Sequence, residues 1–105
     1  VIGVNNTGYG LKNFNRIKGN FEFLINKPLN PQSIFELMQK ESKFSDKEMY
    51  ETFNMGVGFF IICKEKDSDR VLQIAKEGKI IGGVRKGKAR TILEKGNKKI
   101  AFEGY

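Results

Sequence analysis

The stretch EMYETFNMGVGFF, residues 48–60, decides how this chain is interpreted, because three kinds of local sequence meet in it. It begins with helix-compatible residues, passes through Asn54, Gly56 and Gly58, and ends in an apolar run. An apolar run without polar alternation is typical of a buried strand, so we expect Val57 to Cys63 to be a central strand. Glycines before a strand let another chain or a ligand approach the backbone closely, but they also serve in a bulge or in tight packing.

Composition limits the classes of protein to which the chain can belong. At 105 residues it has room for one domain, and 39% hydrophobic residues with nine phenylalanines indicate a folded chain rather than a disordered one. Cys63 is the single cysteine, which excludes an internal disulfide and favours a reducing cytoplasm. No apolar run approaches the roughly 20 residues that span a bilayer, so we expect no membrane contact. Histidine is absent, so we expect no metal site in this chain.

Upstream of residue 48, the pattern predicts a strand, a short helix, a second strand and two further helices. The short helix follows a glycine turn and is expected to end at Gly19. The next helix is expected to start with Asn30 as its cap and Pro31 as its first residue. Ser45 and Glu48 match a capping box that predicts a helical turn over 46–53. The positions behind these expectations are Val1–Val4, Leu11, Phe14 and Ile17, Phe21, Phe23 and Ile25, and Ile34, Leu37, Met38 and Glu41.

Downstream of the quoted stretch, the sequence predicts one helix and a closing set of strands. Asp67 is expected to cap a helix that ends at Gly78 and turns four side chains toward the core, namely Val71, Leu72, Ile74 and Ala75. Short strands are expected at 80–84, 91–93 and 100–102, separated by Gly87 and by Gly96-Asn97. We therefore predict an α+β fold for a single domain over 1–105, with a mostly antiparallel sheet and helices packed on one face.

A second glycine-containing segment, residues 5–11 with the sequence NNTGYGL, is the other candidate for chemistry. It is a glycine turn that opens a helix, where unpaired backbone N–H groups and the positive end of the helix suit a phosphate. Thr7 adds a hydroxyl group as a further donor. Gly8 and Gly10 allow close approach, although glycines between a strand and a helix often serve only the turn.

Positive charge accumulates in the last third of the chain. The formal net charge is +7, and the basic residues of this region are Lys79, Arg85, Lys86, Lys88, Arg90, Lys95, Lys98 and Lys99. Contact with nucleic acid is one interpretation. We favour the other, in which lysines protect exposed edge strands and keep a small domain soluble, because no aromatic stacking platform is interleaved with them.

Residues 48–58 resemble the EMYRTFNMGIG signature of the aminoimidazole ribonucleotide (AIR) synthetase family, also called phosphoribosylformylglycinamidine cyclo-ligase, of purine biosynthesis. Residues 4–11, VNNTGYGL, resemble the family's AHITGGGL segment, and Asn13, Arg16 and Ile17 echo the following ENIPRVLP. Residues 31–39 are similar to PPIFRLIQ, and residues 81–84 to the late IGEV strand. The resemblance covers nearly the whole chain but only the later part of that family's C-terminal domain. Because the chain also begins at Val1, without methionine, we expect it to be a fragment.

The resemblance implies a homodimeric enzyme of the cytoplasm whose N-terminal domains supply most of the ATP and magnesium ligands. ATP would phosphorylate the formyl amide oxygen of formylglycinamidine ribonucleotide, and an amidine nitrogen would then close the imidazole ring. The C-terminal domain would cover the cleft and meet the ribonucleotide and the N-terminal domain, and the fragment alone would be inactive. The residues that the resemblance places at the cleft are Asn5, Thr7, Gly8, Gly10, Asn54, Gly56 and Gly58; it assigns no catalytic residue.

Three departures from the family pattern leave alternatives open. The family's histidine falls on Asn5, which cannot shuttle a proton near neutral pH, and its isoleucine falls on Asn6. Its middle glycine falls on Tyr9, which would narrow a phosphate nest. The chain is then either a diverged branch that keeps the reaction or an enzyme with a different substrate, and we favour the first. The competing classes are a related ATP-dependent enzyme of the same superfamily, such as a thiamine-phosphate kinase or a hydrogenase-maturation protein, and a non-catalytic module that binds nucleic acid.

Overall fold

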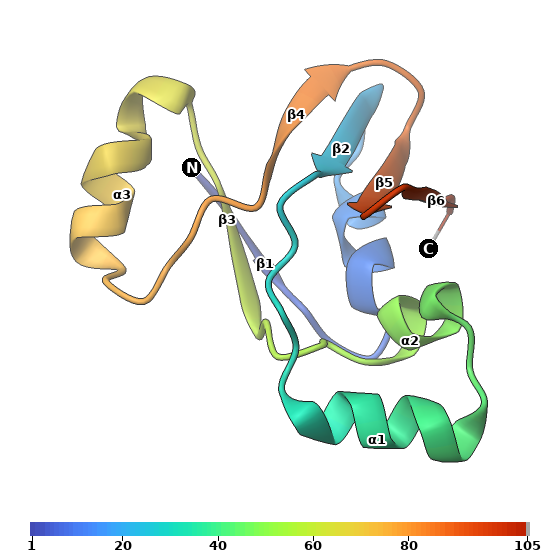
Figure 1. Ribbon diagram of the computed structural model, residues 1–105. Coiled ribbons are helices and arrows are strands. Elements are labelled where there is room, and N and C mark those ends of the chain that lie inside the picture. The colour runs from blue at the N-terminus through green and yellow to red at the C-terminus, as the bar shows by residue number, and fades with distance from the viewer. Residues whose placement is uncertain (105) are drawn as a thin grey trace.

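The strands form two sheets in the computed structural model, which describes residues 1–104 (Figure 1). A two-stranded antiparallel sheet pairs β1 (Ile2–Asn5) with β3 (Phe59–Ile62). A four-stranded sheet has the order β4-β2-β5-β6, built from β2 (Phe21–Ile25), β4 (Gly82–Lys86), β5 (Arg90–Lys95) and β6 (Lys98–Phe102). Among the strand pairs that the structure describes, β2–β5 alone is parallel. The predicted α+β class with mostly antiparallel pairing is confirmed, but the strands are divided between two sheets.

Five short helical segments connect these strands, and none of those described has the length and apolar character needed to cross a bilayer. They are η1 (Gly10–Arg16), α1 (Ser33–Ser42), α2 (Asp46–Thr52), η2 (Glu65–Asp67) and α3 (Ser68–Ile74), where η marks a 3-10 helix. The capping box of α2 is confirmed, because Ser45 Oγ accepts from Glu48 N at 3.1 Å and Glu48 Oε1 accepts from Ser45 N at 3.1 Å. The predicted start of α1 at Pro31 is wrong. Gln32 is extended, and its carbonyl accepts the first turn's bond from Phe35 N.

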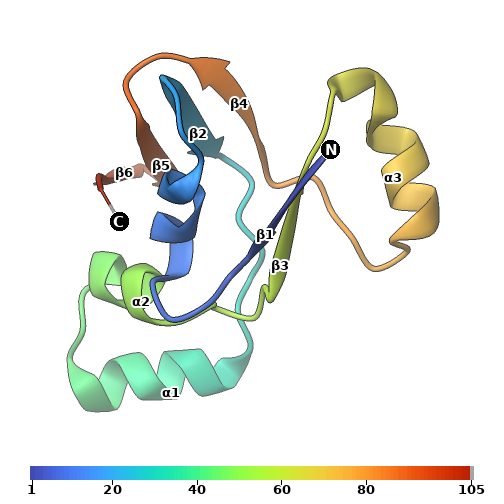
Figure 2. The same ribbon diagram turned by 180° about the vertical axis from the view of Figure 1, so that it is seen from behind.

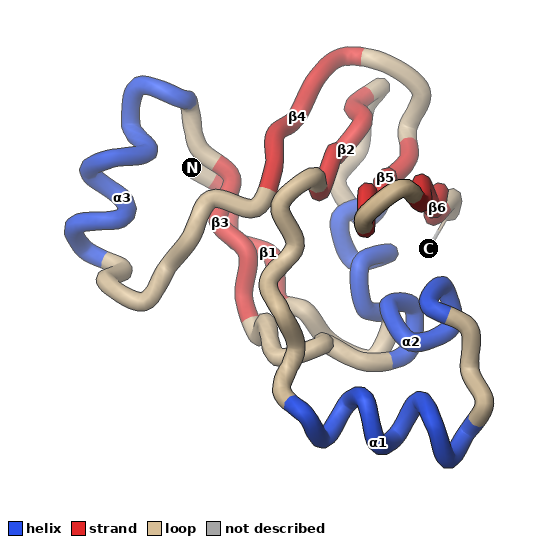
Figure 3. Tube along the Cα trace, in the orientation of Figure 1, coloured by secondary structure: helices blue, strands red, loops and turns tan. Residues whose placement is uncertain are grey.

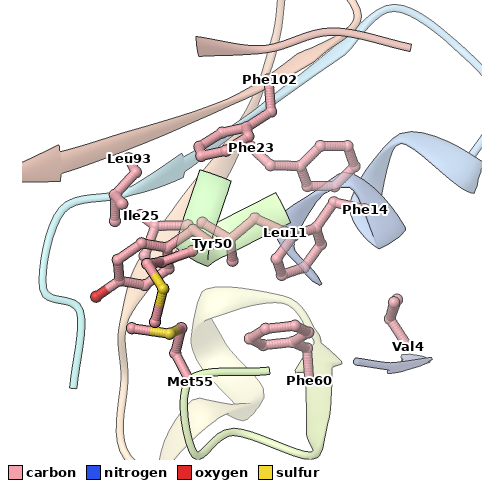
Figure 4. Close-up of a cluster of buried hydrophobic side chains, with 11 residues drawn as sticks. Val4, Leu11, Phe14, Phe23, Ile25, Tyr50, Met55, Phe60, Leu93 and Phe102 are labelled. Atoms are coloured by element: carbon pink, nitrogen blue, oxygen red, sulfur yellow. The ribbon is translucent and has the colours of Figure 1, made fainter. Parts of the chain in front are cut away.

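The hydrophobic core fills the space between the four-stranded sheet, η1, α2 and the two-stranded sheet (Figure 4). Phe14 of η1 joins the two sheets, since its ring centroid lies 5.2 Å from that of Phe23 on β2 and 4.4 Å from that of Phe60 on β3. The buried hydrophobic residues are Val4, Leu11, Phe14, Phe23, Ile25, Met49, Tyr50, Met55, Phe60, Leu93 and Phe102. Segments from both ends of the chain therefore meet in one core.

Two predicted core elements lie at the periphery instead. β3 is not a central strand, because it pairs only with β1, and Phe59 is 53% exposed. α3 buries no residue, and Ile74 at its end is 78% exposed. Figures 2 and 3 show α3 standing apart from the four-stranded sheet, to which a long loop connects it. The apolar face predicted for α1 is also only partly covered, since Ile34 and Leu37 are exposed.

The basic residues of the last third are mostly paired with carboxylates. Buried Glu22 of β2 accepts from Arg85 Nε at 2.6 Å and from Arg90 Nε at 2.8 Å, which joins β2 to both neighbouring strands. The remaining pairs are Lys88 with Glu103, Lys95 and Lys98 with Asp46, and Lys99 with Glu94. Because these side chains are paired within the chain, a role in stabilising and solubilising the fold explains them better than contact with nucleic acid does.

Glu22 should make the chain sensitive to acid. The Arg90 hydrogen bond, followed by that of Arg85, holds the pKa of the Glu22 carboxyl below its ordinary value of 4.5. Because the pKa is lower in the folded state than in the unfolded state, the ion pairs stabilise the fold fully above pH 4.5. This stability is lost as the pH falls below 4.5 and through the lowered pKa of the folded state. We expect Glu22→Gln to flatten the fall of the melting temperature on acidification, whereas Glu103→Gln, at an exposed pair, should change the curve less. Parallel curves for wild type and Glu22→Gln would contradict this role.

Candidate functional site

The turn after β1 is held by a network of hydrogen bonds centred on Asn13. Gly10 N donates to Thr7 O at 2.9 Å, which closes the turn before η1. Asn13, fully buried, donates through Nδ2 to Gly10 O at 2.7 Å and to Thr7 O at 3.4 Å. Its Oδ1 accepts from Thr7 Oγ1 at 3.1 Å. The hydroxyl proton of Thr7 is therefore engaged within the chain, which leaves the oxygen to act toward a ligand as an acceptor.

The candidate residues of this turn differ in accessibility. Asn5, Thr7 and Gly8 are exposed, whereas Gly10 is buried beneath α2. Gly10 has φ of +56°, and a Cβ built there would lie 1.8 Å from the carbonyl oxygen of Tyr50. The segment that approaches the backbone of Gly10 is therefore α2.

The second candidate segment, residues 54–58, is a compact loop between α2 and β3. Asn54 Oδ1 accepts from Gly56 N at 2.8 Å, and Val57 N donates to Asn54 O at 3.0 Å. Met55 and Gly56 both have positive φ, at 52° and 90°. Asn54, Gly56 and Gly58 are exposed. The loop thus presents backbone and an amide side chain at the surface while Met55 and Val57 anchor it to the core.

Asn6 brings the two candidate segments together. Its backbone N donates to Gly58 O at 3.0 Å, and its side-chain Nδ2 donates to Val57 O at 2.7 Å and to Asn54 O at 3.1 Å. The residue is only 6% exposed. Its Oδ1 is buried and has no hydrogen-bond partner among residues 1–104. The turn at 5–10 and the loop at 54–58 therefore form one corner of the molecule, below called the Asn6 corner.

Sequence reasoning missed both Asn6 and Asn13, although one signal was present for the first of them. Asn6 follows Val4 by two residues, and side chains at i and i+2 of an extended segment share a face. Val4 faces the core, so Asn6 turns inward too. Asn13 offers no comparable signal, because its role depends on the turn that it caps.

The hollow at the Asn6 corner is small. A cavity of about 30 Å³ lies beneath it, lined mainly by apolar side chains together with Asn6, Tyr50 and Asn54. This volume suits about one water molecule and excludes a nucleotide. A ribonucleotide could rest only on the outside of the corner, so its remaining contacts would have to come from another part of an enzyme.

Gly56 and Gly58 should respond differently to substitution by valine. Gly56 has φ of +90°, and a Cβ there would meet Gln32 Oε1 at 2.1 Å. The side-chain amide of Gln32 can move, but the backbone strain remains, so we expect Gly56→Val to cost about 1 to 3 kcal/mol in a denaturant titration. A Cβ at Gly58 meets nothing within 4 Å, so Gly58→Val should change stability by about 0.5 kcal/mol or less. Equal losses at the two positions would contradict this distinction.

Comparison with known families identifies a match over most of the chain. Residues 13–94 match the family described as AIR synthase related protein, C-terminal domain. Among curated proteins, the chain is 47% identical over 79 residues to phosphoribosylformylglycinamidine cyclo-ligase of Methanosarcina mazei. It is 33% identical over 111 residues to the protein of the same name from Methanococcus maripaludis.

Each alignment covers most of this chain but only a small part of the relative. The Methanosarcina match covers 74% of this chain and 23% of the relative, and the Methanococcus match covers 92% and 31%. The chain therefore spans about a quarter to a third of the length of these relatives. The matched part contains α2 and the 54–58 loop, since both lie within residues 13–94.

Proposed function

Since this chain belongs to the AIR synthase related C-terminal domain family, we propose that it is the C-terminal part of an ATP-dependent phosphoribosylformylglycinamidine cyclo-ligase. The full enzyme would close the imidazole ring of aminoimidazole ribonucleotide from formylglycinamidine ribonucleotide in purine biosynthesis. The observation that carries the proposal is the Asn6 corner, where two segments distant in sequence present exposed backbone and amide groups side by side. In this proposal residues 1–105 are one folding unit of a cytoplasmic homodimer and are inactive alone.

The chain's own residues would bind and position the ribonucleotide. Asn5, Thr7, Gly8, Asn54, Gly56 and Gly58 would face the substrate, and Gly10 would hold the turn against α2. Phosphoryl transfer depends mainly on positioning and electrostatic stabilisation. Amide side chains and backbone N–H groups can contribute to both, whereas the Thr7 hydroxyl oxygen can position a substrate only as an acceptor. An asparagine at position 5 does not transfer protons near neutral pH, so this corner supplies contacts rather than acid–base chemistry.

We assign the ATP and Mg²⁺ ligands mainly to the N-terminal half of the enzyme. Mg²⁺ prefers carboxylate and phosphate oxygens. Among residues 1–104, no group of three or more histidine, cysteine, aspartate or glutamate side chains is arranged to hold a metal ion. The polar groups around the Asn6 corner are amides, one hydroxyl group and backbone, with no carboxylate among them, which suits a polar ribonucleotide better than a metal. When bound, ATP would supply the phosphoryl group that activates the formyl amide.

A chimaeric enzyme tests this function directly. The matched segment of the Methanosarcina mazei cyclo-ligase is replaced by residues 1–105, and ADP release is measured with and without formylglycinamidine ribonucleotide. We expect ADP release that requires the ribonucleotide, together with formation of aminoimidazole ribonucleotide. A folded chimaera that binds ATP but shows no ribonucleotide-dependent turnover would overturn the proposal and favour a different substrate.

Asn54→Ala in that chimaera should separate binding from stability. We expect turnover to fall about tenfold or more, because the side chain both faces the proposed substrate and orients the loop through Gly56 N. The melting temperature should change little, since Asn54 is exposed. Asn26→Ala, at another exposed asparagine, is the matched control and should leave turnover unchanged. Unchanged turnover in Asn54→Ala would assign the residue to local packing.

A further inference from the structure

The β1–β3 sheet has one packed face and one bare apolar face. Val4 and Phe60 point into the core and are 6% and 5% exposed. Phe59 and Ile61 lie on the opposite face and are 53% and 44% exposed. The Phe59 ring lies over Gly3, where an added Cβ would be 2.5 Å from its Cζ. A strand that is apolar on both faces is typical of burial on both sides, yet only one side is covered here.

An apolar hollow continues this bare face toward α3. It has a volume of about 430 Å³. Its apolar lining comes from Val1, Ile61 of β3, Val71 and Ile74 of α3 and the following Ala75, and Asp67 and Arg70 add two charged side chains to it. Figures 1 and 2 both show the β1–β3 pair between α3 and the four-stranded sheet. The exposed end of α3, the hollow and the outer face of β3 therefore form one continuous surface, below called the β3–α3 surface.

The strand edges of the two sheets are protected differently. The outer strands of the four-stranded sheet, β4 and β6, carry Arg85, Lys86, Lys98 and Lys99, and charged edges discourage pairing with other strands. β1 and β3, with the sequences IGVN and FFII, contain no charged residue. Each pairs only with the other among the described strands, so each has an open edge. Their composition is that of strands whose edges and outer face are covered.

We propose that the β3–α3 surface is the docking site for the preceding part of the same cyclo-ligase, which would add a strand to the β1–β3 sheet and cover Phe59 and Ile61 with apolar side chains. This inference rests on the proposed function and adds to it the place where the two parts meet. The relatives support this occupant, because the match to the Methanosarcina protein covers only 23% of its length. About three quarters of such an enzyme is thus available to cover the surface. A second copy of this chain is the competing occupant.

Ile61 and Val84 offer a matched pair of variants, because each is 44% exposed and lies on a strand. In the full-length chimaera we expect Ile61→Lys to lower the melting temperature by roughly 10 °C, since it would bury an unpaired charge. Val84→Lys, on the charged edge strand β4, should lower it by about 2 °C or less. Should Ile61→Lys fail to fold, Ile61→Thr gives a milder shift in the same direction. Equal small shifts at the two positions, or a chimaera that cannot fold at all, would overturn the docking site.

Sedimentation of the isolated chain tests the competing occupant. We expect a monomer at micromolar concentration for both wild type and Ile61→Lys. A dimer that Ile61→Lys converts to a monomer would overturn the proposal in favour of a second copy.

The docking surface and the proposed function can be rejected independently of each other. A chimaera sensitive to Ile61→Lys but without ribonucleotide-dependent turnover rejects the function and keeps the surface, whereas an active chimaera insensitive to Ile61→Lys rejects the surface and keeps the function.

Discussion

Gly10→Ala should cost about 3 kcal/mol or more, a large fraction of the roughly 5 to 15 kcal/mol that stabilises an ordinary small domain. The added methyl group would lie 1.8 Å from the carbonyl oxygen of Tyr50 and 2.7 Å from its carbonyl carbon. Both are backbone atoms of α2 and cannot swing away as a side chain would. The residue also has φ of +56°, which L-residues adopt at a cost. Relief would require α2 to move away from the core.

Gly8→Ala is the control for this prediction. A Cβ at Gly8 meets nothing within 4 Å, so we expect a change of about 0.5 kcal/mol or less. Chemical denaturation of both variants, followed by circular dichroism, measures the difference. A Gly10→Ala variant that unfolds at the same denaturant concentration as Gly8→Ala would show that α2 does not press on the turn.

Asn6→Ala should be the second severe substitution, with a loss of about 2 to 3 kcal/mol. It removes the two hydrogen bonds that Nδ2 donates to the carbonyl oxygens of Asn54 and Val57. Those oxygens would keep the cost of burial without their side-chain donor. The loop would also lose its side-chain connection to the turn, so the corner proposed to face the substrate should loosen along with the fold.

Asn5→Ala is the matched control, since Asn5 is exposed and adjacent in sequence. We expect it to change the free energy of unfolding by about 0.5 kcal/mol or less. Hydrogen exchange at the amides of residues 54–58 adds a local measurement, which should rise in Asn6→Ala and stay constant in Asn5→Ala. If the two variants were equally stable, the hydrogen bonds of the Asn6 side chain would not contribute measurably to the free energy of unfolding.

Local patterns in the sequence predicted much of the fold. The Ser45 capping box predicted the start of α2, because both of its hydrogen bonds form between neighbours in sequence. Alternation in 21–25 predicted β2, and Gly96-Asn97 predicted the turn between β5 and β6. Each of these elements is specified within a few residues, so no long-range information was needed.

The failures have other causes. The apolar residues of β3 and α3 predicted burial, and the pattern cannot say whether the covering element lies within the same chain. Asn30 and Pro31 form a good helix start in isolation, but the chain stays extended through Gln32. For β3 and α3 the position of distant segments decides the outcome, and that position is not written in the local sequence. The start of α1 differs from the prediction by two residues, within the ordinary uncertainty of a helix boundary predicted from sequence.

The candidate site was only partly accessible from sequence. Motif resemblance selected the 5–10 turn and the 54–58 loop, and the structure places them against each other. The connecting residue, Asn6, lies where the family has an isoleucine, so the resemblance gave no reason to choose it. Its contacts span 48 and 51 residues of sequence, a separation that no local pattern reports.

The parallel pairing of β2 with β5 also governs the order in which the molecule can form. Glu22 pairs with Arg90 and Ile25 with Leu93, so the central strand of the larger sheet waits for partners some 68 residues later. A nascent chain leaving the ribosome would expose Phe23 until β5, which ends at Lys95, had been made. Contacts of such high sequence separation slow folding, and unpaired apolar strands invite aggregation meanwhile. Synthesis of this chain should therefore benefit from chaperones or low temperature.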